Sequence, residues 1–244
     1  MIGRRTTLWG AAFLVCTGLS ACQGIPPKLT TAAQVAPGGG CLWGNAAAIS
    51  SALSSRSEHS GNPRLDASLG EILAEMADIL AVRPRFAFYQ DGGLPNAVAL
   101  PASDYAGSFG TVLFGLTMLS RVDTMTHGDL FVQAVCAHEF AHVRQYRTPF
   151  FARLDRPNSV RLVELHADFL AGYYLGRLPQ SFGADALVAL GRAWETLGDS
   201  QFTRREHHGT PEERIAAIEA GFVRGQQRMG IDQAAEAGAR YLGA

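Results

Sequence analysis

Three residues at a fixed spacing, His138, Glu139 and His142, could bind a metal ion and use it. Positions i and i+4 lie on one side of a helix, so both imidazoles can reach the same ion. Zinc accepts neutral histidine nitrogens and keeps a position for water in catalytic sites. Glu139 is offset by about 100° from His138 on a helix, where its carboxylate can take a proton from that water. The pattern predicts two zinc ligands and a general base.

A third ligand is expected in a second helical stretch, residues 160–174, which contains Glu164 and Asp168. These carboxylates are four residues apart and share a helix face, so one can bind the metal while the other accepts a hydrogen bond from a ligand histidine. We expect Glu164 to bind and Asp168 to orient His138 or His142. His166 lies about 200° around the helix from Glu164, so it is expected to be a surface or packing residue, with a role as metal ligand as a distant alternative.

The elements that must position these residues follow from hydrophobic periodicity. The motif lies on the apolar face of a helix expected at residues 129–146, where two polar rings would need partners. An earlier helix is expected at 65–82, ended by Pro84, and short strands are expected at 86–89, 96–100 and 110–115. The prediction is an α+β, mostly helical domain with a small β-sheet beside the motif helix. The alternative for the histidines is an ordinary core pair bonded to backbone or water.

The N-terminus resembles an export signal. Arg4 and Arg5 precede an apolar stretch that ends in Leu-Ser-Ala-Cys at Cys22, which is similar to a bacterial lipobox. That resemblance implies a lipoprotein signal peptide at 1–21, lipidation of Cys22, a membrane anchor through the acyl chains and an envelope location facing the periplasm, the outer membrane being favoured. A plain secretory signal is the alternative, and the route, Sec or twin-arginine, stays open. Residues 22–44 are expected to be a flexible tether.

Composition excludes one class of partner. Acidic and basic residues nearly cancel, with a formal charge of -1, and no Lys/Arg run with interleaved aromatics is present, so nucleic acid is not expected as a partner. Cys41 and Cys136 would remain in the exported chain, and a disulfide between them is left open.

His138-Glu139-Phe140-Ala141-His142 followed by Glu164-x-x-Ala167-Asp168 resembles the gluzincin metallopeptidases, in particular the HtpX-like and CAAX-prenyl-protease-like families. The segments 95–101 and 110–115 are also similar to those families. The resemblance implies a zincin-like zinc metallopeptidase domain at 45–244, with Zn²⁺ as cofactor and a protein or peptide as substrate. A peptide is expected to pair as an added strand with the segment Gly110, Thr111, Val112 and Leu113.

Near the C-terminal end, the stretch from His208 to Arg214 is similar to a His-Pro-x-x-x-x-Arg segment of those families, but Gly209 departs from it and is closer to the predicted neutral zinc metallopeptidases. A His and an Arg beside the site could stabilise negative charge that develops during hydrolysis. The segment also has a good helix start, with Thr210 as N-cap and Pro211 in the first turn.

Taken together, the sequence predicts a zinc endopeptidase that acts on exported or envelope proteins, with Glu139 as general base. Two rivals remain: a non-catalytic lipoprotein that keeps the zinc fold as a scaffold, and an amidase of cell-wall peptides. The oligomeric state is left open.

Overall fold

The computed structural model describes residues 46–92, 96–122, 125, 127–179, 190–191 and 208–244. The expected signal peptide, Cys22, Cys41 and all of the expected tether lie outside these residues. The described part is α+β and mostly helical, as expected, with one three-stranded sheet. None of its helices is both long and apolar enough to cross a membrane.

The sheet consists of β1 (Arg85–Tyr89), β2 (Ala97–Leu100) and β3 (Thr111–Gly115) in the order β1-β3-β2. Strand β3 is parallel to β1 and antiparallel to β2. The three expected strands are therefore confirmed. A Cβ on Gly115 would lie 2.0 Å from Oδ2 of Asp91. The Asp91 carboxylate accepts hydrogen bonds from Thr117 N and Met118 N in the first turn of α3 (Leu116–Val122).

The expected role of Gly110–Leu113 as a strand that binds the substrate is wrong. Because β3 is the central strand, both of its edges are already paired, and a peptide cannot add to either. The neighbouring strand β2 lies against α4 (Gly128–Arg147), and all four of its residues are buried.

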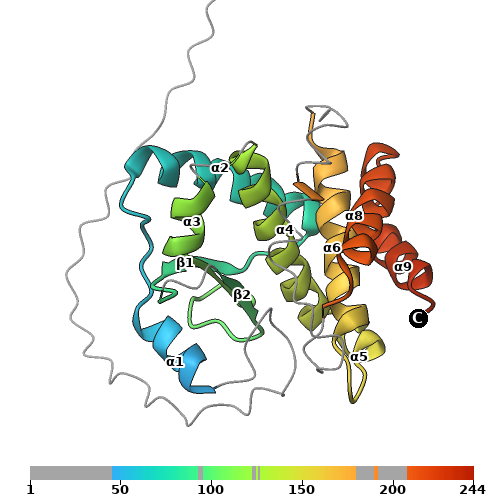
Figure 1. Ribbon diagram of the computed structural model, residues 1–244, viewed down its shortest axis with the longest axis horizontal. Helices are drawn as coiled ribbons and strands as arrows, with labels where there is room; N and C mark the ends of the chain where they lie inside the picture. Colours follow the sequence, from blue (N-terminus) through green and yellow to red (C-terminus); the bar gives the residue numbers. More distant parts are fainter. Residues whose placement is uncertain (1–45, 93–95, 123–124, 126, 180–189, 192–207) are drawn as a thin grey trace, which may run out of the picture. The chain divides into compact units, whose positions relative to one another are not determined.

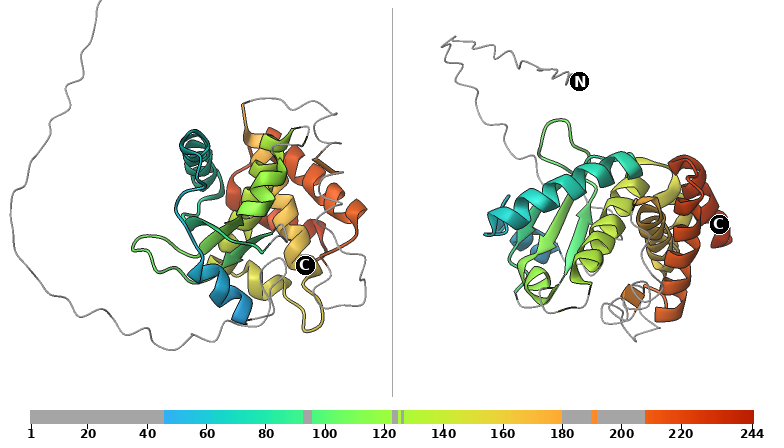
Figure 2. Two further views of the ribbon diagram at one scale, coloured as in Figure 1. Left: turned by 60° about the vertical axis from the view of Figure 1, so that its left-hand side comes forward. Right: turned by 90° about the horizontal axis from the view of Figure 1, so that it is seen from above.

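Two long helices place the candidate ligands side by side. Helix α4 extends the expected segment by one residue at each end, and α6 (Arg161–Arg177) covers most of the second expected stretch. Figure 1 shows α4 between the sheet and α6, and the second panel of Figure 2 shows the same order from above. Helix α2 (Pro63–Leu80) packs against both. Its start is set by Asn62, whose side chain accepts from Arg64 N and Leu65 N.

The described part of the chain also contains α1 (Ala46–Ser54), α5 (Phe150–Leu154), α8 (Pro211–Gln226) and α9 (Ile231–Tyr241). Helices α8 and α9 pack against the side of α6 that faces away from the sheet (Figure 1). Thr210 caps α8 by accepting from Glu213 N, while the Glu213 carboxylate accepts from Thr210 N, so the expected helix start is confirmed.

Helices α6 and α8 are in backbone contact through glycines on both sides. A Cβ on Gly172 would lie 1.9 Å from the carbonyl oxygen of Ile218, and one on Gly221 would lie 1.8 Å from that of Phe169. Gly176 and Gly225 extend the contact by one turn on each helix. Small residues at such spacing let two helix backbones approach closely. This contact fixes α8 firmly against the helix that carries Glu164 and Asp168.

The main apolar core joins α2, the sheet, α4 and α6 around large buried side chains such as Met76, Phe114 and Phe140. Cys136 of α4 belongs to this core and forms no disulfide with any described residue. Burial and the charge of Glu139 raise the pKa of its thiol, which keeps it in the neutral form.

Candidate metal centre

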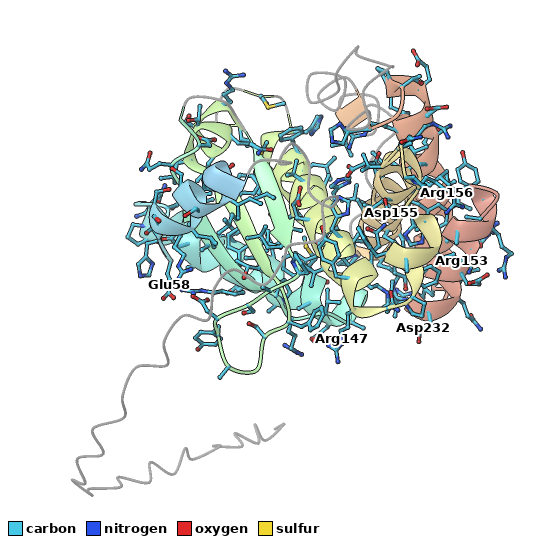
Figure 3. All side chains as sticks on the ribbon, turned by 90° about the horizontal axis from the view of Figure 1, so that it is seen from below. Glu58, Arg147, Arg153, Asp155, Arg156 and Asp232 are labelled. Carbon is cyan, nitrogen blue, oxygen red and sulfur yellow. The ribbon has the colours of Figure 1, made fainter. Side chains whose placement is uncertain are left out.

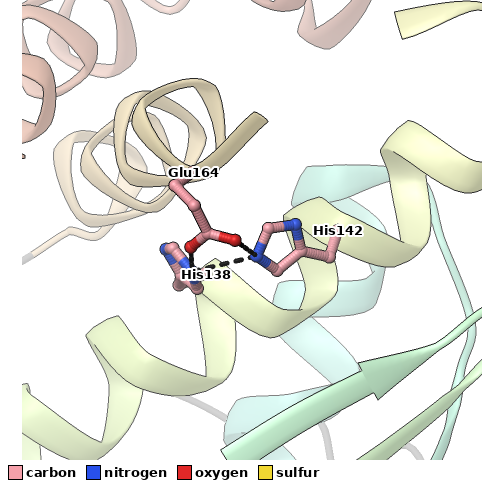
Figure 4. Close-up of side chains that lie close together, drawn as sticks. All are labelled: His138, His142 and Glu164. Atoms are coloured by element: carbon pink, nitrogen blue, oxygen red, sulfur yellow. Dashed lines mark hydrogen bonds and ion pairs between the residues drawn. The ribbon is translucent and has the colours of Figure 1, made fainter. Parts of the chain in front are cut away.

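Three side chains from two helices converge on one point: His138 and His142 of α4 and Glu164 of α6 (Figure 4). Nε2 of His138 lies 3.0 Å from Nε2 of His142. Glu164 places Oε2 at 3.3 Å from His138 Nε2 and Oε1 at 3.5 Å from His142 Nε2. The prediction from their spacing is thus confirmed, since the two histidines lie one turn apart and point to the same side of α4. This group could hold a metal ion.

The centre lies inside the protein. His138, His142 and Glu164 are at most 2% exposed. Buried polar groups that face one another require hydrogen bonds or a compensating charge. The hydrogen bonds of Nδ1 in each imidazole therefore determine whether its Nε2 can act as a metal ligand.

His138 is oriented by Asp168, one turn along α6 from Glu164. Its Nδ1 lies 2.8 Å from Asp168 Oδ1. Arg214 of α8 donates to the same carboxylate twice, from Nε to Oδ2 at 2.7 Å and from Nη2 to Oδ1 at 2.9 Å. Burial raises the pKa of Asp168, but Arg214 and His138 outweigh it and lower the pKa to about 2. An ionised Asp168 can only accept, so Nδ1 of His138 carries the proton.

His142 is oriented by Gln145, whose Oε1 lies 2.9 Å from His142 Nδ1. The orientation of this amide is fixed, because its Nε2 lies 2.8 Å from the carbonyl oxygen of Val163, which can only accept. The amide oxygen must therefore face His142 and accept from its Nδ1. In both histidines Nδ1 therefore carries a hydrogen, so in its neutral form each imidazole presents the lone pair of Nε2 to the centre.

Two imidazole lone pairs and one carboxylate consequently meet within 3.5 Å. Such an arrangement needs a positive charge, which a proton on a histidine or a metal ion could supply. Burial raises the pKa of Glu164, but the charges of His142 and His208 and hydrogen bonds with His138 and His142 outweigh it and hold the pKa well below its usual range. In the absence of a metal ion these causes require a proton on Nε2 of His142, which a bound cation would replace.

Glu139 and His208 are the remaining expected catalytic residues that the structure describes near this centre. Glu139 follows His138 on α4 and is 1% exposed. His208 is 4% exposed and lies close enough to Glu164 to lower its pKa. Their roles in catalysis stay predictions.

Arg214 has a different place from the one expected. Its Nε and Nη2 both bind Asp168, which in turn binds His138. We therefore assign it to positioning, because it acts through Asp168 on a ligand histidine. Its expected part in stabilising charge on a substrate stays a prediction.

Gln145 and His166 were missed as members of the site. Gln145 follows His142 by three residues, a spacing that places both on one helix face, so this signal was present in the sequence. His166 is fully buried, and its Nδ1 lies 3.1 Å from Gln145 Nε2. Burial lowers the pKa of His166 to about 4, so it is neutral near pH 7. It is a packing residue, as expected, but with polar partners.

No family model matches this chain, and neither the curated proteins nor the solved structures contain a significant match. What the site can do therefore rests on its own geometry and chemistry.

Proposed function

We propose that this protein is a zinc-dependent endopeptidase. One observation carries the proposal: two histidine Nε2 atoms and a Glu164 carboxylate converge within 3.5 Å, and a further carboxylate, Glu139, follows the first histidine on the same helix. Two neutral imidazoles and one carboxylate are a donor set typical of catalytic zinc in peptidases.

The spacing of the ligand atoms supports zinc. A tetrahedral ion with bonds of about 2.1 Å separates its ligand atoms by about 3.4 Å. The three separations in this centre are 3.0, 3.3 and 3.5 Å. Imidazole ligands favour zinc and other late transition metals over magnesium and calcium. Three protein ligands also leave a tetrahedral position for water or substrate.

Each residue of the centre has its own role in the proposed hydrolysis. A bound zinc ion supplies Lewis-acid chemistry, which polarises a carbonyl group and acidifies water. Glu139 is the base that removes a proton from the attacking water and passes it to the leaving amine nitrogen. Asp168 and Gln145 hold the two ligand histidines in the tautomer that presents Nε2. We propose that His208, whose charge lowers the pKa of Glu164, stabilises negative charge on the substrate.

We also propose that the protein is exported and anchored by lipid at Cys22, so that its substrates are exported or envelope proteins. This part is tested separately, by the mass of the N-terminal peptide from protein isolated from membranes. A peptide that begins at Cys22 and carries acyl chains would support it, and an unmodified peptide that retains residues 1–21 would contradict it.

The decisive experiment compares the full-length wild type with Glu139→Gln and Glu164→Ala. We measure zinc per chain and the rate of cleavage of fluorescent casein. The wild type should bind about one zinc, Glu164→Ala should lose it, and Glu139→Gln should keep it. Without its base, Glu139→Gln should cleave about 10²- to 10⁴-fold more slowly.

Each other outcome contradicts a part of the proposal or supports one of the two rivals. A wild type without zinc contradicts the metal centre and the peptidase with it. Zinc binding without any cleavage of casein or of purified cell-wall peptides indicates a scaffold, whereas cleavage of the wall peptides alone indicates an amidase. Equal cleavage by wild type and Glu139→Gln would show that Glu139 is not the base.

A further inference from the structure

Gln145 connects the candidate metal centre to the C-terminal helix through a continuous set of hydrogen bonds. From His142 Nδ1 the contacts run to Gln145 Oε1 at 2.9 Å, from Gln145 Nε2 to His166 Nδ1 at 3.1 Å, and from His166 Nε2 to the carbonyl oxygen of Ala235 at 2.9 Å. We propose that these contacts form a relay, the Gln145–His166 relay, through which α9 fixes the tautomer of a zinc ligand. This inference rests on the proposed zinc site.

The direction of every bond in the relay is determined by carbonyl groups at its ends. The oxygen of Ala235 can only accept, so His166 donates from Nε2, and its Nδ1 is left as an acceptor. The two hydrogens of Gln145 Nε2 then go to His166 Nδ1 and to the oxygen of Val163. The amide oxygen remains for His142, which must be protonated on Nδ1. No second arrangement satisfies all of these groups.

Burial makes the arrangement costly to break. Gln145, His166 and His142 are each fully buried. A buried donor or acceptor that loses its partner has no water to replace it. If His166 were absent, one hydrogen of the Gln145 amide would be unpaired, and the amide could rotate away from His142. The effect would pass to the ligand without any contact between His166 and the metal.

Helix α9 holds its end of the relay by contacts on both sides of Ala235. Asp232 forms an ion pair with Arg144 of α4. Glu236 accepts from Arg153 of α5 at 2.7 Å, and Figure 3 shows Arg153 and Asp232 on the side of the molecule where these helices meet. Gly238 of α9 packs closely on the imidazole of His166, because a Cβ on Gly238 would lie 3.0 Å from Cδ2 of His166.

The two ligand histidines thus have supports of different kinds. His138 is held by a carboxylate paired with an arginine, and His142 by a neutral amide held by a neutral imidazole. A carboxylate makes an imidazole a stronger ligand through its charge, whereas an amide acts only through orientation. We therefore assign Gln145 and His166 as positioning residues of the zinc site.

The test measures zinc affinity in the full-length protein by competition with a chromophoric chelator. Gln145→Met keeps an unbranched side chain of similar length but removes all three hydrogen bonds, and its zinc Kd should rise about 10- to 100-fold. His166→Phe keeps an aromatic ring that can stack on Phe150 and removes the polar contacts while leaving Gln145 in place, so its Kd should rise by a smaller factor. Circular dichroism confirms that each variant is folded.

A matched control and a double variant separate the relay from general damage. Gln133→Met alters the same residue type on the same helix, where Gln133 bonds Tyr174 away from the centre, and should leave the Kd unchanged. In a Gln145→Met background, His166→Phe should have no further effect on the Kd, because the relay is already broken. The visible spectrum of the cobalt-loaded protein should change in Gln145→Met and stay constant in Gln133→Met.

The outcomes distinguish this inference from the proposed function. If the wild type binds zinc and Gln145→Met binds it equally well with an unchanged cobalt spectrum, the relay is overturned while the zinc site stands. Additive effects of the two substitutions on the Kd would also overturn it. A wild type that binds no zinc overturns the zinc site and the relay together.

Discussion

At the scale of single residues, the centre depends on which nitrogen of each histidine carries the proton. Asp168 accepts from His138 Nδ1 and Gln145 accepts from His142 Nδ1, so both Nε2 atoms present lone pairs. The side chains that perform this orientation are as buried as the ligands themselves. Substitutions one contact away from the candidate ligands should therefore have large effects.

Asp168→Asn tests the most highly charged of these contacts. The amide could still accept from His138, but Arg214 would lose its counter-charge while only 3% exposed. Breaking a buried ion pair by removing one partner costs about 3–5 kcal/mol. We expect that loss in the free energy of unfolding, measured by urea denaturation with a chelator present.

The control for this substitution is Asp78→Asn, which breaks an ion pair with Arg83 whose two side chains are 70% and 69% exposed. Such pairs contribute at most about 1 kcal/mol. An equally small loss in Asp168→Asn would contradict the interpretation that Asp168 and Arg214 form a stabilising buried pair.

The ligands could be predicted from the sequence because their geometry is local. Two histidines four residues apart on a periodic helix share a face, and Glu164 and Asp168 share another. Gln145 had the same kind of local signal. The partners of His166 had none, because Ala235 lies 69 residues away and contributes a backbone carbonyl, which every residue possesses.

At the scale of elements, hydrophobic periodicity predicted where the long helices and the strands lie, but not how they pack against one another. Helices α2, α4 and α6 and all three strands fall where apolar spacing and turn residues predict them. The order of the strands did not follow, since the pattern of β3 is compatible with an edge or a central position. The close approach of α6 and α8 was also missed, although both helices carry glycines four residues apart.

Gly221→Ala tests whether that close approach positions the site. The new Cβ would lie 1.8 Å from a backbone oxygen of α6, so α8 must move away and draw Arg214 from Asp168. Overpacking of this kind costs about 1–3 kcal/mol. We expect a lower free energy of unfolding and weaker zinc binding, measured by urea denaturation and chelator competition.

Gly70→Ala in α2 provides a control of opposite sign. Gly70 is exposed and a Cβ there has no neighbour within 4 Å. Alanine is favoured over glycine in a helix by about 0.5–1 kcal/mol, so this variant should gain stability. If Gly221→Ala were also more stable than the wild type, the two helices would not be held at backbone contact.

At the scale of the whole molecule, a bound zinc ion would join two helices that belong to one core. His138 and His142 come from α4, which packs on the sheet, and Glu164 comes from α6, which packs on α8 and α9. An ion held by both helices binds the folded chain and not the unfolded one. Metal binding should therefore stabilise the entire described fold, not only the site.

Removal of zinc should lower the melting temperature by an amount that the binding equilibrium determines. At free zinc about a thousandfold above its Kd, binding contributes about 4 kcal/mol to the free energy of unfolding. For a domain of this size each kcal/mol corresponds to about 2–4 °C, so excess chelator should lower the melting temperature by about 8–16 °C. Differential scanning calorimetry of the full-length protein with zinc and with chelator measures this. Glu164→Ala is the control, because it lacks a carboxylate ligand and should melt at the same temperature in both solutions. A wild type that is loaded with zinc and yet shows no shift would mean that the ion is held outside this centre.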